Sequence, residues 1–326
     1  MDCRVKPGND IRENVRPIKD PSSVIELWIP ITVFAAFMQN LRSALQKHLK
    51  GRLSTGGASY VRFFYACPFA LVYLAAVHGI GGHPLPAPNA LFLLYCLLGG
   101  VSQIAFTFLL VYLFSFRNFA VGTVYSKTEI IQVALLGLIL LGDTISIVGV
   151  FAIALGMVGI LALSVAANRD VTWKALATGF FERTTMIGLL CGAFLGASVV
   201  FFRGASLSLG DGAVIMRAAF ALAVSLVMQT VIMGGYLLLR ERGQMTAILR
   251  HWKPSLGVGV AGFLASVGWF TAFTLQNAAY VRAVGQIELV FTFIASVVWF
   301  KERTTRLELC GVALILAAIL LLILAR

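Results

Sequence analysis

The amino-acid sequence predicts an all-α integral membrane protein whose ten transmembrane helices form two inverted five-helix repeats. Apolar residues make up 59% of the 326-residue chain and charged residues only 12%, whereas an average soluble domain has about 25% charged residues. Ten apolar segments follow one another, and the polar pattern of the first half recurs in the second. Together these observations indicate a duplicated membrane unit.

Each apolar segment holds roughly 20 residues, enough to cross a hydrocarbon core of about 30 Å as an α-helix. The segments lack the alternation of apolar and polar residues that is typical of membrane β-strands. Their ends are expected within two to four residues. The predicted spans are residues 27–47, 59–78, 89–115, 119–141, 145–166, 185–204, 213–238, 255–275, 278–299 and 307–325.

The predicted order is tail, repeat, linker, repeat. Residues 1–26 are charged and contain proline, and we expect a disordered tail there. The first ten residues resemble peptides that recur in conceptual translations of bacterial genomes, so a later true start is one interpretation. Residues 27–166 form the first repeat, residues 167–184 a polar linker, and residues 185–326 the second repeat. Five spans is an odd number, so the second repeat enters the membrane with opposite polarity.

The two halves match at a spacing of 159 residues without a gap: Asn118 matches Asn277, and Glu129 matches Glu288. Near the start of the second and seventh spans, Arg62 corresponds to Arg217. A charged residue at the centre of a span costs roughly 2.5–3.5 kcal/mol on insertion scales. Two glutamates at equivalent positions therefore indicate a polar site between the repeats.

The net charge of +12 does not indicate a nucleic-acid partner, because the basic residues are spread over short loops. In a membrane protein such residues mainly report orientation. The five cysteines do not form a disulfide framework, and the cysteines and histidines lack metal-ligand spacing. We therefore expect neither a metal nor a cofactor.

In the first span, Gln39 and Arg42 share one face and Asn40 lies beside it. Two interpretations stay open: hydrogen bonds between helices, or the lining of a wet cavity. In the ninth span, Arg282 and Gln286 lie one turn apart.

In the fourth span, Tyr125, Glu129 and Gln132 share one face of a continuous helix. Lys127 points away from Glu129, so its partner is expected to be Glu288 or a carboxylate of the substrate.

The glutamates have two competing interpretations. Either they form salt bridges with Arg62, Arg217 or Lys127 that hold the bundle together, or they handle substrate or protons. Arg62 and Arg217 lie only a few residues inside their spans and can reach the membrane surface, which favours a structural, anchoring role. Arg282 is placed with them as a structural charge.

These features resemble the EamA-type, ten-helix branch of the drug/metabolite transporter superfamily. The resemblance covers nearly the whole chain after residue 27. It includes Arg62-Phe63 at the start of the second span and the turns that end the fourth and ninth spans, Leu140-Leu141-Gly142-Asp143 and Trp299-Phe300-Lys301-Glu302-Arg303. Lys301 stands where the family has glycine, and Asp143 where it has glutamate.

The resemblance implies a secondary transporter in the cell (inner) membrane, working by alternating access and without covalent chemistry. It implies export of a small polar or amphipathic metabolite, driven by a proton or exchange gradient. Its partners are that metabolite and the lipid bilayer, and no oligomer is required. The expected cavity residues are Gln39, Tyr125, Lys127, Glu129, Gln286, Glu288 and Trp269.

A cavity with both acids and bases suits a zwitterion such as an amino acid. A flippase for a lipid-linked carrier and a non-transporting scaffold remain alternatives. An enzyme is not expected, because the chain has neither a His-Glu-x-x-His nor a Gly-x-Ser-x-Gly motif.

Two lines of reasoning conflict on orientation. The odd-numbered loops hold 14 Lys and Arg, whereas the even-numbered loops and the C-terminus hold only Arg203 and Arg326. The positive-inside rule then places the odd loops in the cytoplasm and both termini outside. The family resemblance implies both termini in the cytoplasm. We follow the charges.

Overall fold

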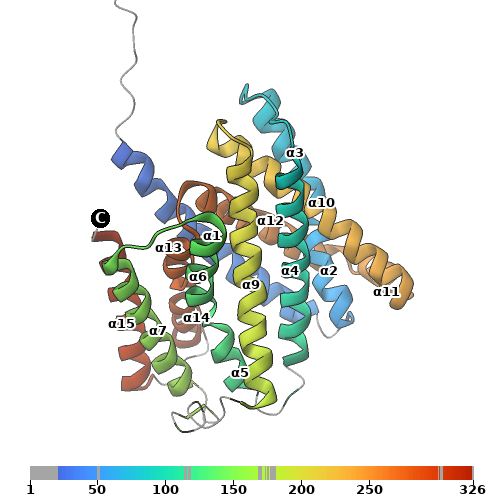
Figure 1. The fold of residues 1–326 in the computed structure, drawn as a ribbon. Coiled ribbons are helices and arrows are strands. Elements are labelled where there is room, and N and C mark those ends of the chain that lie inside the picture. The colour runs from blue at the N-terminus through green and yellow to red at the C-terminus, as the bar shows by residue number, and fades with distance from the viewer. Residues whose placement is uncertain are drawn as a thin grey trace, which may run out of the picture.

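The computed structural model describes residues 21–49, 52–113, 116, 119–167, 171–172, 174, 176, 181–299, 301 and 304–324. In these residues all regular secondary structure is helical. Figure 1 shows the helices running side by side as one bundle, with the start of the first helix and the end of the last at the same end. This arrangement agrees with the expected all-α class.

The first half of the chain contributes α1 (Pro21–Leu49), α2 (Thr55–Phe64), α3 (Ala66–Gly79), α4 (Ala90–Leu113), α5 (Phe119–Ser126), α6 (Glu129–Leu141) and α7 (Ile147–Ala167). The second half contributes α9 (Arg183–Ser208), α10 (Val214–Arg240), α11 (Gln244–Arg250), α12 (Trp252–Leu275), α13 (Ala278–Gly285), α14 (Ile287–Trp299) and α15 (Arg306–Leu324).

Nine segments of the described chain are long and apolar enough to cross a membrane. They correspond to the second to tenth predicted spans. The first predicted span, residues 27–47, is helical within α1 but is not one of these nine. Because α1 begins at Pro21, the prediction of a disordered tail is wrong for residues 21–26, while residues 1–20 lie outside the described part. Asn118, and Glu302 in the turn that ends the ninth span, also lie outside it.

Three predicted spans are each divided into two helices. The sequence analysis did not anticipate the breaks in the fourth and ninth spans. The second span is interrupted at Tyr65, between α2 and α3. Pro68 explains this break, because it has no N–H to bond the carbonyl of the residue four positions earlier. The fourth span is interrupted at Lys127 and Thr128, and the ninth at Gln286. Two of the three breaks therefore lie next to the repeated glutamates.

The closest helix pairs join the two halves of the chain. Helix α1 packs along α12, α4 along α9, and α7 along α15, while α10 packs against α2 and α3, and α6 against α13. Figure 1 shows α7 and α15 together at one edge of the bundle and α9 beside α4. The halves are thus interleaved, and the core lies between them.

Many large apolar side chains point outward. On α7, Ile147 and Phe151 are exposed, and on α15, Leu320 and Leu324 are exposed. A water-soluble protein seldom exposes contiguous apolar surface of this kind, but it suits contact with lipid.

Helix α9 presents three glycines to the broken fourth span. A Cβ at Gly188 would lie 2.2 Å from the carbonyl oxygen of Gly122 in α5, and one at Gly192 would lie 2.9 Å from the carbonyl oxygen of Ser126. At Gly196 a Cβ would lie 3.2 Å from the side chain of Val133 in α6. Small residues let membrane helices approach this closely, so α9 supports the segment that carries Glu129.

We expect Gly188→Ala to lower the melting temperature of the purified protein in detergent. The added methyl group meets backbone, which cannot move aside as a flexible side chain can, and such overpacking costs roughly 1–3 kcal/mol. Gly235→Ala is the matched control, because a Cβ at Gly235 meets no atom within 4 Å. Equal melting temperatures for the two variants would show that the close approach of α9 and α5 is not needed for stability.

Candidate functional site

The break in the fourth span places Glu129 at the start of a helix inside the bundle. Helix α5 ends at Ser126, and the amides of Lys127 and Thr128 bond the carbonyls of Val124 and Tyr125 in a tight turn. Glu129 is the first residue of α6 and is 1% exposed. The first N–H groups of a helix favour a nearby carboxylate, so this break suits an acidic residue.

The ninth span is built in the same way. Helix α13 ends at Gly285, Gln286 forms the turn, and Glu288 lies in the first turn of α14. The amide of Gln286 bonds the carbonyl of Ala283. Each half of the chain therefore presents a glutamate at the start of a short helix within the bundle.

Glu129 forms an ion pair with Arg282 of α13. Both side chains are buried, with 1% and 4% exposure. The guanidinium carbon of Arg282 also lies 5.0 Å from the centre of the Trp269 ring, a distance typical of a cation–π interaction. This pair joins the two halves and is closed to solvent.

Glu288 is held by three side chains of the first half. Lys127 Nζ lies 2.7 Å from Oε1, and Gln39 donates to Oε2 at 2.8 Å. Asn40 donates to the backbone carbonyl of Glu288 at 2.7 Å. The Lys127 side chain is 23% exposed and that of Glu288 is 10% exposed. This second pair is therefore more accessible than the first.

Trp269 of α12 connects the two ion pairs. Its indole N–H donates to Gln39 Oε1 at 3.0 Å, while Gln39 holds Glu288 through its amide nitrogen. The same indole ring contacts Arg282, the partner of Glu129. The structure thus joins Gln39, Asn40, Lys127, Glu129, Trp269, Arg282 and Glu288 in one network.

Several expectations about this network need correction. Tyr125 and Glu129 do not share one helical face, because the helix is interrupted between them. The Tyr125 hydroxyl instead donates to the carbonyl of Leu176 in the linker. Of the two partners left open for Lys127, the structure has Glu288. Glu129 pairs with Arg282, which was not among the partners expected for the glutamates.

The remaining charged candidates, Arg62 and Arg217, take no part in these two ion pairs. Arg217 donates to the carbonyl of Gly210 at 3.1 Å, close to the start of α10, which agrees with a role at the end of a span. Arg62 contacts the ring of Phe63, with its guanidinium carbon 4.8 Å from the ring centre.

A third ion pair was missed, although both of its residues were noted in the sequence. Arg203 of α9 donates from Nε and Nη2 to the Asp143 carboxylate at 2.8 and 3.0 Å. Its Nη1 donates to the carbonyls of Phe273 and Gln276 at 2.6 Å each. We call this set the Arg203 latch. It ties the α6–α7 loop of the first half to the end of α12 in the second.

A second contact strengthens the same end of the bundle. The Asn277 side-chain amide donates to the carbonyl of Thr144 at 3.3 Å. The repeat drew attention to Asp143 and Asn277, but a match between copies does not reveal which residues meet across the halves. The useful signal is that Arg203 ends the sixth predicted span beside an even-numbered loop, and Asp143 lies in another even-numbered loop on the same side of the membrane.

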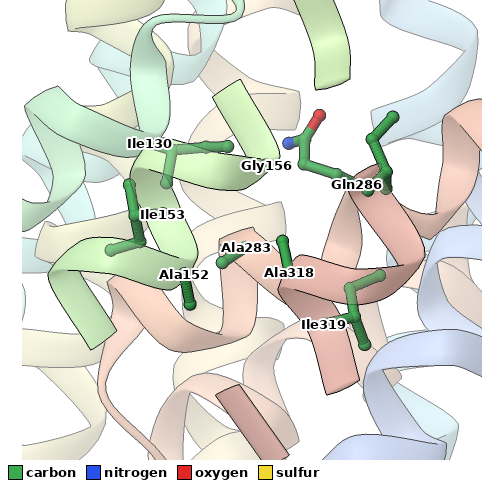
Figure 2. Close-up of a pocket in the computed structure, with 9 residues that line it drawn as sticks. Ile130, Ala152, Ile153, Gly156, Ala283, Gln286, Ala318 and Ile319 are labelled. Carbon is green, nitrogen blue, oxygen red and sulfur yellow. The ribbon is translucent and has the colours of Figure 1, made fainter. Parts of the chain in front are cut away.

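Gln286 borders a small pocket between α6, α7, α13 and α15. Figure 2 shows the Gln286 amide beside Ile130, with mainly aliphatic side chains and Gly156 around it. The Gln286 side-chain oxygen is buried without a hydrogen-bond partner among the described residues. Gln286 therefore lies next to the charged network but points into an apolar recess.

Comparison with known proteins agrees with this architecture. Residues 183–324 match the EamA-like transporter family. A solved crystal structure aligns with 94% of this chain and 97% of its own chain, with a TM-score of 0.66 and 13% sequence identity. At this identity the likeness shows the fold alone. No curated protein matches the chain.

The family match confirms the resemblance drawn from the sequence, and nine described segments have the length and composition of membrane spans. The second half of this multi-pass membrane protein, residues 183–324, is thus similar to the EamA-like transporters of the drug/metabolite transporter superfamily.

Proposed function

We propose that the protein is a secondary transporter that exports a small polar or amphipathic metabolite across the cytoplasmic membrane by alternating access. The observation that carries this proposal is the network at the two helix breaks, where Lys127–Glu288 and Glu129–Arg282 each join the two halves. Broken helices at a repeat interface are typical of substrate sites in secondary transporters.

The packing supports an arrangement of two inverted repeats. If the first five spans exchange with the last five, the pair α1–α12 becomes the pair α9–α4, and both pairs pack closely. The pair α7–α15 maps onto itself under the same exchange, and so does the contact of the second span with the seventh, which α3 and α10 make. A two-fold axis between the halves accounts for all four contacts.

The Arg203 latch supplies a closed end for alternating access. It holds the α6–α7 loop against the α12–α13 loop, so one half cannot separate from the other there while Asp143 keeps Arg203. Opening this end requires the latch to break. By the charges of the loops, this end faces outward, and the opposite end loads substrate from the cytoplasm.

At the centre, Glu288 is the group that exchanges partners. Its Lys127 partner is partly exposed, so a substrate carboxylate or a proton can compete for the pair. Glu129 and Arg282 are buried and hold the two breaks together. In this proposal the Lys127–Glu288 pair opens during transport, whereas the Glu129–Arg282 pair stays closed and stabilises the fold.

Locking the Arg203 end should stop transport. We would introduce Thr144→Cys and Asn277→Cys, whose parent residues are in contact, into a background without the native cysteines. Membrane vesicles loaded with a metabolite extract would then be treated with a reducible bifunctional thiosulfonate. We expect protein-dependent efflux, measured by mass spectrometry, to cease after treatment and to return after reduction.

Each single-cysteine variant, treated in the same way, is the control and should keep its efflux. Unchanged efflux from the cross-linked double variant would contradict alternating access at this end. If no metabolite leaves vesicles that contain the wild-type protein faster than vesicles without it, the transporter proposal itself is wrong.

A further inference from the structure

The network leaves two positive charges without a counterion. Lys127 and Arg282 are matched by Glu288 and Glu129. Arg42 of α1 and Arg62 of α2 also lie in predicted spans, and among the described residues neither forms an ion pair. An unmatched charge inside a span is costly, so two of them near one site require an explanation.

Arg42 lies beside the network. It is three residues after Gln39, so the two share a face of α1, and Gln39 bonds the Glu288 carboxylate. Arg42 is also close enough to feel the charge of Glu288. A Cβ at Gly262 of α12 would lie 3.2 Å from Cδ of Arg42 and 3.8 Å from the carbonyl oxygen of Arg62. The absence of a side chain at Gly262 leaves room for Arg42 here.

Arg62 is the second member of the pair. It lies in the last turn of α2 and is within range of the charge of Arg42. Neither arginine is fully buried. Arg42 lies seven residues before the end of α1 at Leu49, and Arg62 seven residues after the start of α2 at Thr55. The pair therefore lies on the side of the basic odd-numbered loops, opposite the Arg203 latch.

We propose that Arg42 and Arg62 form an anion-binding subsite and that the substrate is a small organic anion. This inference rests on the proposed transport function and names its substrate class. Guanidinium groups bind carboxylate and phosphate oxygens through paired hydrogen bonds, and a bound anion supplies the missing negative charge. Since both glutamates are occupied by cations of the chain, the remaining charge favours an anion over a zwitterion.

The subsite also gives the substrate a route to the centre. An anion held by Arg42 lies next to Gln39 and Glu288, and the partly exposed Lys127 is the cation paired with Glu288 there. The anion can then replace Glu288 as the ion-pair partner of Lys127. This is the exchange of partners that the transport proposal requires. Arg42 and Arg62 act here as substrate-binding residues.

The test compares metabolites by charge. Vesicles with the wild-type protein are loaded with a metabolite extract, and every compound whose efflux depends on the protein is identified by mass spectrometry. We expect these compounds to be anionic at pH 7. Arg42→Gln and Arg62→Gln should each raise the half-saturating concentration for the best such compound by about tenfold to a hundredfold, the effect of one charge-assisted hydrogen bond.

Arg217→Gln is the matched control, because Arg217 lies near the start of α10 and bonds only the Gly210 carbonyl among the described residues. It should leave the concentration dependence unchanged. If a glutamine variant fails to reach the membrane, Arg42→Lys and Arg62→Lys keep the charge but lose the paired hydrogen bonds, and a weaker affinity is still expected.

Protein-dependent efflux of cationic or uncharged compounds only would overturn the anion subsite while leaving the transport function intact. Normal affinity in the Arg42 and Arg62 variants would do the same, and would indicate that the arginines anchor the helices. If the wild-type protein moves no compound at all, the proposed transport function fails and the subsite with it.

Discussion

Replacing Arg282 with methionine should remove most of the protein from the membrane. The substitution leaves the Glu129 carboxylate, which is 1% exposed, without its cation in the middle of the bundle. Breaking one side of a buried ion pair costs about 3–5 kcal/mol, because the remaining charge has no partner and little water. We would measure the amount of full-length protein in the membrane and its melting temperature in detergent.

The double variant Glu129→Leu/Arg282→Met should recover both quantities, since replacing a whole buried pair with apolar residues is often neutral or stabilising. Arg250→Met is the control for loss of one arginine, because Arg250 is exposed at the end of α11. Normal abundance of the single Arg282 variant would show that Glu129 does not depend on this partner. Glu129 would then become a candidate for substrate or proton handling.

The sequence could locate the glutamates because the repeat is gapless over that part of the chain. The spacing from Glu129 to Glu288 equals that from Asn118 to Asn277, and each glutamate interrupts an apolar span. Nine of the expected spans were also found, because length and hydropathy decide whether a segment can cross a membrane. These features depend on local composition.

The breaks in the fourth and ninth spans were missed because composition does not change at them. Around Lys127 and Gln286 the chain has no proline, and apolar residues continue on both sides. Assuming a continuous helix then gave Tyr125 and Glu129 one face, which the break removes. A basic or amide residue two positions before the glutamate is a local feature that both breaks share.

The partners of the charges depend on tertiary contacts between spans far apart in sequence. Glu129 and Arg282 are separated by 153 residues, and Lys127 and Glu288 by 161. Periodicity identifies which residues share a helix face, but it cannot specify which helices meet. The same limit applies to Arg203, whose three partners lie in two different loops and at the end of α12.

Replacing Glu288 with glutamine should strongly reduce transport while the protein remains abundant in the membrane. This outcome separates the two glutamates, because the Lys127–Glu288 pair is partly exposed. Gln39 can still bond the side chain of residue 288, and Asn40 its backbone carbonyl. Glutamine keeps the shape of the glutamate side chain but removes its negative charge, which Lys127 releases and binds again in the proposed transport cycle. The expected loss is about tenfold to a hundredfold or more, the range for a hydrogen bond to a charged group.

Lys127→Met tests the other side of this pair. We expect it to insert normally, since it removes an intramembrane charge, and to change which compounds are transported or how transport is coupled. The charge-exchanged variant Lys127→Glu/Glu288→Lys restores an ion pair, so it should be as abundant in the membrane as the wild type even if the pair is needed for folding. It should stay inactive, because it reverses the charge that meets the substrate. Wild-type efflux from Glu288→Gln vesicles would rule out partner exchange at Glu288, and aggregation of Lys127→Met would show that the pair belongs to the scaffold.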